Sequence, residues 1–150
     1  MTEKSILIAS DHRGYPLKKL LIGWLKEKGY DVRDLGPEGE SMRVNASDYA
    51  VRVASAMRSD DKLRGILICG TGQVMAMTAN RFKHIRAALC TNSTMARLAR
   101  EHNDANVLVL GAHISGEEVV KECLNVFLDT PHLGGRYAER CQLLTDLGGL

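Results

Sequence analysis

The sequence lacks close-spaced cysteines, an excess of charge of one sign and any long apolar run. Its cysteines are Cys69, Cys90, Cys123 and Cys141. Their wide spacing excludes a zinc knuckle and a thioredoxin-like redox pair. A net charge of +2 is too small to attract nucleic acid or an anionic membrane. No apolar stretch approaches the ~18 residues of a membrane span, and the first residues do not read as a signal peptide. We therefore expect a cytoplasmic protein that binds neither nucleic acid nor a membrane.

Length and composition indicate one compact domain. The chain has 150 residues, of which 45% are hydrophobic and 25% are charged, with only three prolines. A chain of this length buries roughly two-thirds of the surface that its unfolded state exposes, which is enough for a single core. No repeat, linker or low-complexity segment interrupts the sequence. We expect residues 1–150 to form a single domain.

Short apolar runs alternate with amphipathic stretches along the whole chain, as buried strands alternate with helices in α/β proteins. The expected strands are 5–9, 30–35, 65–69, 85–89 and 107–110, and the expected helices are 16–28, 48–57, 74–81, 94–102, 117–128 and 135–147. The alternating polarity of 30–35 is typical of an edge strand. Because the helix of a right-handed parallel crossover packs back on the sheet, the pattern predicts a doubly wound, Rossmann-like α/β fold: a five-stranded parallel sheet with helices on both faces.

In such a sheet ligands bind beyond the carboxyl ends of the strands, where the winding reverses. The turns after the first and third strands are the first candidates, and they carry Asp11 and His12 in one case and residues 69–72 in the other. An Asp at such a position is often a turn or N-cap residue, and a strand cysteine is often a small core residue. Cys69, however, directly precedes a glycine turn that opens a helix and offers N–H groups to anionic oxygen.

The glycine turn after Cys69 does not match the common nucleotide-binding motifs. A dinucleotide fingerprint needs a third glycine where this chain has Met75, and no Gly-Lys-Ser/Thr follows as in a P-loop. A thiol beside a helix start holds more thiolate near neutral pH than a free cysteine does. Cys69 is therefore a candidate nucleophile or proton-abstracting base.

Two basic groups lie elsewhere in the chain. His102 belongs to a polar string, 100–106, that precedes the fifth strand, so it lies at the amino edge of the sheet, opposite the Cys69 turn. If His102 shares that chemistry, a second chain delivers it; the alternative is an exposed histidine that the helix dipole favours. Arg136 and Arg140 share one helix face and suit a phosphate group, although a solvated charged face has the same pattern.

Five segments together carry a family resemblance. They are Ser10-Asp11-His12, residues 65–72, Ala79-Asn80, residues 100–108 and Gly134-Gly135-Arg136. In this order they closely resemble the type B ribose-5-phosphate isomerases, within the family shared with galactose-6-phosphate isomerase. The resemblance implies an aldose–ketose isomerase without metal or cofactor that interconverts ribose 5-phosphate and ribulose 5-phosphate through an enediolate. It also implies a homodimer or homotetramer with shared active sites, and we expect the last helix to pack on a partner subunit.

The resemblance assigns a role to each of the candidate residues. Cys69 would be the base that moves the proton between carbons 1 and 2, and His102 the acid that opens the furanose ring. The other roles are assistance at the sugar oxygens by Thr71 and Asp11, enediolate stabilisation by the amides of Gly70 and Gly72, support of ring opening by Asn103, and phosphate binding by His12, Arg136 and Arg140. Preorganised donors at a developing oxyanion and a positioned base suit this chemistry.

The chain departs from the family pattern around the expected ligand. Asn45-Ala46-Ser47 replaces a usual Asp-Tyr-Pro, which removes an aromatic wall; Val74 and Ala76 replace a glycine and a serine; and His113, expected to bind substrate, replaces a frequent phosphate arginine. Because the expected base and acid persist, we interpret these changes as altered substrate choice. The alternatives are an isomerase of another aldose phosphate, such as allose 6-phosphate, galactose 6-phosphate or a four-carbon sugar phosphate, or a non-catalytic sugar-phosphate-binding relative.

A receiver-like domain is the remaining alternative, because Asp11 after the first strand also fits an acidic metal pocket. Such a pocket needs a second acidic residue beside Asp11 and a lysine after the last strand, and the chain has His12 and the segment 111–113 instead. Magnesium-dependent phosphorylation would support this alternative, and indifference to a chelator would oppose it.

Overall fold

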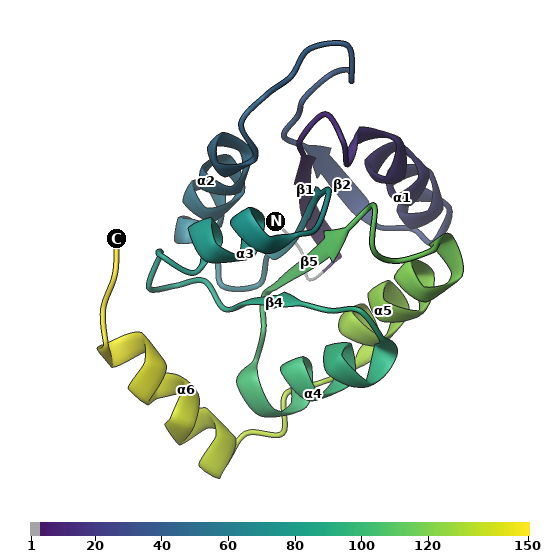
Figure 1. Ribbon diagram of the computed structural model, residues 1–150. Coiled ribbons are helices and arrows are strands. Elements are labelled where there is room, and N and C mark those ends of the chain that lie inside the picture. The colour runs from purple at the N-terminus through teal and green to yellow at the C-terminus, as the bar shows by residue number, and fades with distance from the viewer. Residues whose placement is uncertain (1–3) are drawn as a thin grey trace.

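Five parallel strands form a sheet in the order β2-β1-β3-β5-β4 within residues 4–150, which this computed structural model describes (Figure 1). The strands are β1 Ser5–Ser10, β2 Asp31–Asp34, β3 Arg64–Cys69, β4 Ala87–Leu89 and β5 Val107–Gly111. The helices are α1 Tyr15–Glu27, α2 Ala46–Ala56, α3 Gln73–Ala79, α4 Ser93–Asn103, α5 Glu117–Asp129 and α6 Arg136–Asp146, with a 3-10 turn, η1, at Met57–Ser59. The predicted doubly wound α/β sheet, with the second strand at one edge, is confirmed.

The pleat of the central strands divides the core into two layers. Ile6 and Ile8 of β1 belong to the layer that α1, α4 and α5 complete, whereas Leu7 and Ala9 belong to the layer that α2 and α3 complete. Because helices cover both faces, strands such as β1 are apolar at successive positions rather than at alternate ones. Helix α6 contributes no residue to either layer. Within residues 4–150 no helix combines the length and the apolarity needed to cross a membrane.

The winding of the sheet reverses between β1 and β3, which are direct neighbours in it. Ser10 pairs with Ile68 in their register. The N–H of Asp11 then donates to the carbonyl oxygen of Ile68 at 3.1 Å. The turn after β1 is thus hydrogen-bonded to the end of β3, so the residues that follow the two strands lie at one edge of the sheet.

One asparagine explains two of the three boundaries that the sequence places two residues away from their position in the structure; the third is the start of α2, expected at residue 48 and found at Ala46. The expectations that a helix reaches residue 81 and that a strand begins at residue 85 are wrong, since α3 ends at Ala79 and β4 begins at Ala87. The side-chain amide of Asn80 donates to the carbonyl of Ala87 at 2.9 Å and accepts from its N–H at 2.8 Å. These side-chain hydrogen bonds replace continued helix on one side and strand pairing on the other.

Candidate active site

A cavity of about 330 Å³ opens beyond the carboxyl ends of β1 and β3. The residues expected from those two turns line it together, namely Asp11, His12, Cys69, Gly70 and Thr71. The predicted meeting of the two turns is therefore confirmed. Asn45 and Val74, which the sequence places around the expected ligand, also line the cavity, whereas sequence reasoning missed Arg13, Arg43 and Val44.

Asp11 is buried and held in one orientation by the turn after β1. Its Oδ1 accepts a hydrogen bond from the N–H of Gly14 at 2.8 Å. Only glycine fits at position 14, because a methyl group there would lie 2.6 Å from the carbonyl oxygen of Ile68. The close fit of the turn against β3 fixes the carboxylate at the cavity wall, where its remaining lone pairs can accept from sugar hydroxyls.

His12 has its tautomer set by the loop that precedes α2. The N–H of Val44 donates to Nδ1 of His12 at 3.2 Å, so Nδ1 is the acceptor nitrogen. In the neutral ring the proton then lies on Nε2. His12 can therefore donate a hydrogen bond from Nε2 to an oxygen in the cavity.

Cys69 is buried, and its sulfur accepts a hydrogen bond from the turn that follows it, just before α3 begins. Cys69 is only 4% exposed, and the N–H of Gly72 donates to its Sγ at 3.1 Å. Gly72 adopts φ +83°, in the left-handed region, where glycine carries no steric penalty. The glycine turn therefore directs one of its N–H groups at the Cys69 sulfur.

The remaining donors of the glycine turn have no partner of their own. Among residues 4–150 the N–H groups of Gly70 and Thr71 make no backbone hydrogen bond, while Oγ1 of Thr71 accepts from the N–H of Gln73 at 3.3 Å. The carbonyl of Gly70 accepts from the N–H of His113 at 2.9 Å, which brings the turn after β5 to the same edge. The two free N–H groups are available to an anionic oxygen.

Cys90 and Cys123 are core residues rather than site residues. Both are buried in the layer that contains α4 and α5. Burial raises the pKa of the Cys90 thiol to about 12 and also raises the pKa of Cys123. Neutral thiols of this kind pack as small apolar side chains. Cys141, on α6, is partly exposed and lies 3.6 Å from the carbonyl oxygen of His102.

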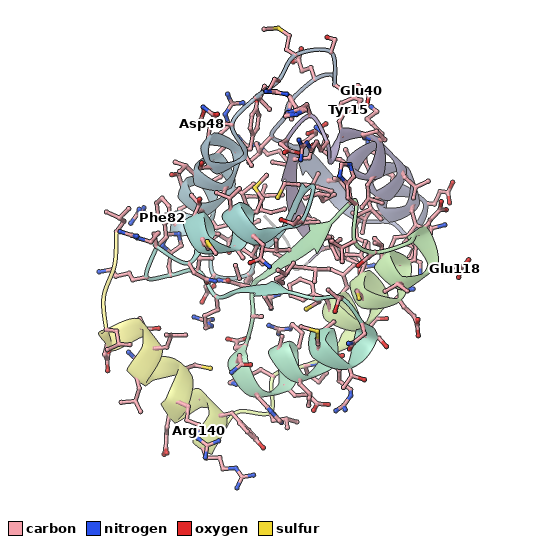
Figure 2. The ribbon with its side chains drawn as sticks, viewed as in Figure 1. Tyr15, Glu40, Asp48, Phe82, Glu118 and Arg140 are labelled. Atoms are coloured by element: carbon pink, nitrogen blue, oxygen red, sulfur yellow. The ribbon has the colours of Figure 1, made fainter. Side chains whose placement is uncertain are left out.

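The expected acid and the expected phosphate arginines form a second cluster, on α4 and α6. The His102 ring stacks on the ring of Tyr137, with centroids 4.3 Å apart and planes 4° from parallel. The guanidinium carbons of Arg136 and Arg140 lie 5.0 Å and 5.7 Å from the centre of the same tyrosine ring. Arg140 projects away from the sheet in Figure 2. One aromatic ring thus gathers three basic side chains into a patch suited to an anion.

The two clusters lie at opposite edges of the sheet in one chain. Cys69 pairs with Gly111 at the carboxyl end of β5, whereas His102 lies at the end of α4, just before the amino end of that strand. Five residues of β5 separate these ends, a length on the order of 15 Å. The chain therefore does not bring His102 to its own Cys69, as the order of elements predicts.

Helix α6 lies apart from the sheet and is mostly uncovered (Figure 1). No α6 residue is buried, and Leu143 and Leu144 are 67% and 53% exposed, with Leu147 beyond the helix at 84%. A separate cavity of about 560 Å³ runs between the end of this segment and β4, and Asn103 lines it rather than the cavity at Cys69. Exposed leucines in such a row mark a surface for protein contact.

No group of three His, Cys, Asp or Glu side chains within residues 4–150 is arranged to hold a metal ion. The polar groups at the cavity are instead one carboxylate, one imidazole, one thiol, two guanidinium groups, the Asn45 amide, the Thr71 hydroxyl and the free N–H groups of the glycine turn. Together they can abstract a proton, stabilise an oxyanion and bind hydroxyl groups.

The chain matches the Ribose/Galactose Isomerase family model over residues 6–144. It is 38% identical to ribose-5-phosphate isomerase B of Escherichia coli over 142 residues, which are 95% of this chain and 95% of that protein. The solved structure of ribose-5-phosphate isomerase B from Clostridium thermocellum is 43% identical with a TM-score of 0.91, covering 95% of this chain and 96% of that one. The corresponding Mycoplasma genitalium structure, with bound ribulose 5-phosphate, is 38% identical with a TM-score of 0.92, covering 95% of each chain.

Proposed function

The chain belongs to the ribose/galactose isomerase family, and we propose that this isomerase interconverts ribose 5-phosphate and ribulose 5-phosphate with Cys69 as the base. The relatives named as ribose-5-phosphate isomerase B support this choice of substrate, as does the ribulose 5-phosphate bound to the Mycoplasma genitalium relative. Since the protein is an enzyme, the receiver-like and non-catalytic alternatives are set aside.

The observation that carries the proposal is the Cys69 sulfur at the cavity wall, hydrogen-bonded to the N–H of Gly72 at 3.1 Å. The thiolate takes the proton from carbon 2 of the open-chain aldose, the C–H electron pair forms the double bond between carbons 1 and 2, and the carbonyl electrons move onto oxygen 1. The thiol then returns the proton to carbon 1 while the hydroxyl proton passes from oxygen 2 to oxygen 1. The product is the ketose, and no proton or electron is lost.

The enediolate is stabilised by the free amides of the glycine turn. The N–H groups of Gly70 and Thr71 have no other backbone partner, whereas the N–H of Gly72 serves the sulfur. Each preorganised donor at a developing oxyanion lowers the barrier by about 3 to 4 kcal/mol in a site closed to water. Asp11, fixed by the N–H of Gly14, accepts from a sugar hydroxyl and orients the reacting carbons.

The acid that opens the ring and the arginines that bind phosphate come from a second subunit. His102, Asn103, Arg136 and Arg140 lie away from the cavity of their own chain, and the exposed leucines of the α6 segment provide a contact surface. A homodimer in which α6 packs on the partner would bring these residues to the partner's cavity and would cover the exposed leucines. A tetramer would repeat the arrangement. The free thiols suit the reducing cytoplasm.

The test is isomerisation of ribose 5-phosphate by the purified protein in the presence of EDTA, before and after alkylation of thiols. We expect the activity to survive EDTA and to be abolished by iodoacetamide. Bound substrate should protect the enzyme against this loss. The matched control is Cys141→Ala, which removes the partly exposed thiol of α6 and should leave both the activity and its loss on alkylation unchanged. Alkylation of Cys69, shown by peptide mass mapping, without loss of rate would contradict the proposal.

A second candidate substrate is another aldose phosphate, and the walls of the cavity favour testing it. Asn45 and Val74 line the cavity, Val74 is 42% exposed, and Ala46 begins α2 where the family resemblance leads one to expect an aromatic residue. A wall without an aromatic ring leaves more room beside the sugar. Turnover of allose 6-phosphate, galactose 6-phosphate and a four-carbon aldose phosphate, each at several concentrations, would decide, because the physiological sugar has the highest kcat/KM.

A further inference from the structure

Arg13 is a cation of the cavity wall that has no role in the reaction described so far. It lies in the turn between β1 and α1, exposed to solvent. It borders the cavity that contains Cys69 and also a neighbouring hollow of about 490 Å³ that His113 lines. Among residues 4–150 the guanidinium of Arg13 forms no ion pair. An unpaired guanidinium at this place is available to an anion that enters the cavity.

The backbone around Arg13 is held in place by two hydrogen bonds. Asp11 precedes it and donates its N–H to the carbonyl of Ile68 at 3.1 Å. Gly14 follows it and donates its N–H to Oδ1 of Asp11 at 2.8 Å. The backbone of Arg13 is therefore held against the end of β3 by a hydrogen-bonded turn. This reduces the entropy that is lost when the side chain binds a ligand.

The side chains of Arg13 and His113 converge on one spot beside Gly70. A methyl group on Gly70 would lie 3.3 Å from Cδ and 3.6 Å from Nη1 of Arg13, and 3.6 Å from Nδ1 of His113. The N–H of His113 also donates to the carbonyl of Gly70 at 2.9 Å. A guanidinium, an imidazole and the free N–H of Gly70 thus flank one point at the cavity rim, and all three are hydrogen-bond donors suited to phosphate oxygens.

We propose that Arg13, together with His113, binds the phosphate group of the substrate from the same chain that supplies Cys69. This inference rests on the proposed function, because it assumes a phosphorylated sugar in the cavity. Arg136 and Arg140 of that chain lie on α6 and do not line its cavity. Arg43 also lines the cavity, but Arg13 is the guanidinium that lies with His113 beside Gly70. A planar guanidinium binds two phosphate oxygens at once, so Arg13 fixes the distance between the phosphate and the sulfur within one subunit.

The experiment measures phosphate affinity in Arg13→Gln, with Arg33→Gln as the matched control. Arg33 is an exposed arginine of the edge strand β2 that lines neither hollow. The dissociation constant of inorganic phosphate is measured by calorimetry, and KM is measured for ribose 5-phosphate. We expect both to rise about tenfold to a hundredfold in Arg13→Gln, the effect of losing a charge-assisted hydrogen bond, and neither to change in the control. Because Arg13 is exposed, all variants should keep the thermal midpoint of the parent.

A rescue variant tests the convergence of the two side chains. His113→Arg in the Arg13→Gln background places a guanidinium at the same spot from the β5 side, so most of the lost phosphate affinity should return. No recovery in a folded double variant, or an unchanged affinity in Arg13→Gln, would overturn the inference. A parent protein that binds phosphate through Arg13 but isomerises no sugar phosphate would instead overturn the proposed function and leave this anion site in place.

Discussion

Replacement of Lys18 tests the buried ion pair that holds the loop beside the cavity. Lys18 is 0% exposed, although it is a lysine on α1. Its Nζ lies 2.9 Å from Oδ1 of Asp34 and donates to the carbonyl oxygen of Pro37 at 2.5 Å. Pro37 lies in the loop between β2 and α2, and Val44, near the far end of that loop, donates its N–H to His12. The ammonium therefore ties α1 to a segment that lines the site.

The cost of removing the ammonium follows from the burial of its partners. Lys18→Met keeps an unbranched apolar chain and removes hydrogen bonds to charged groups of about 1.5 to 3 kcal/mol each. Relief from desolvating the ammonium offsets part of that loss. The Asp34 side chain is 36% exposed, so water replaces its partner, but the Pro37 carbonyl is left unpaired. We expect Lys18→Met to lower the free energy of unfolding by about 2 kcal/mol. Lys18→Ala, which also removes methylene groups, should cost about 2 to 3 kcal/mol more.

Urea unfolding followed by circular dichroism measures both values, at one protein concentration because an oligomer's stability depends on it. Lys19→Met, which alters the exposed neighbour on the same helix, is the control and should change stability by less than about 0.5 kcal/mol. A Lys18→Met variant as stable as the parent would refute the reasoning. It would show that the ammonium of Lys18 adds nothing to the stability that the apolar part of the side chain provides.

Two other predictions concern a core thiol and the shared site. Because burial raises the pKa of Cys90 to about 12, the folded state keeps a proton that the unfolded state releases above about pH 8.5. The contribution of the protonated Cys90 thiol to the free energy of unfolding is full below that pH, and it declines by about 1 to 2 kcal/mol between pH 8 and pH 10. The midpoint of urea unfolding should therefore fall less steeply with pH in Cys90→Ala than in the parent. Equal slopes in the two proteins would contradict this prediction. Mixing Cys69→Ala and His102→Asn chains should restore up to about a quarter of the parent activity, since half of randomly formed dimers are hybrids with one intact site of two. Inactive hybrids, with their formation shown by native mass spectrometry, would place both residues in one subunit.

The sheet and the meeting of its turns could be predicted because they depend on pattern and chain order. Buried strands such as β3 are apolar at successive positions, and the helices that cover them repeat every three to four residues. Parallel strands place all their carboxyl ends at one edge, so Asp11 and Cys69 must be neighbours once β1 and β3 are adjacent. The same rule places His102 at the other edge.

Features that depend on individual side-chain hydrogen bonds could not be predicted from the pattern. Asn80 ends α3 and starts β4 late through its amide, which no periodicity reveals. The path of residues 36–44 is set by contacts with Lys18 and His12, so the place of Arg43 and Val44 in the cavity wall does not follow from the sequence. Nothing in the sequence distinguishes Arg13 from an ordinary turn residue, because only the packed structure shows that its side chain lies beside Gly70.

Hydrogen exchange at the substrate tests most directly whether Cys69 moves the proton. In D₂O, ribose 5-phosphate incubated with the parent protein should lose its carbon-2 proton signal in the ¹H NMR spectrum as deuterium from solvent is incorporated. We expect the rate of this loss to fall about 10² to 10⁴-fold in Cys69→Ala, the contribution of a positioned base, and to be unchanged in Cys141→Ala. An equal rate of deuterium incorporation in the Cys69→Ala variant and the parent would show that another group removes the proton.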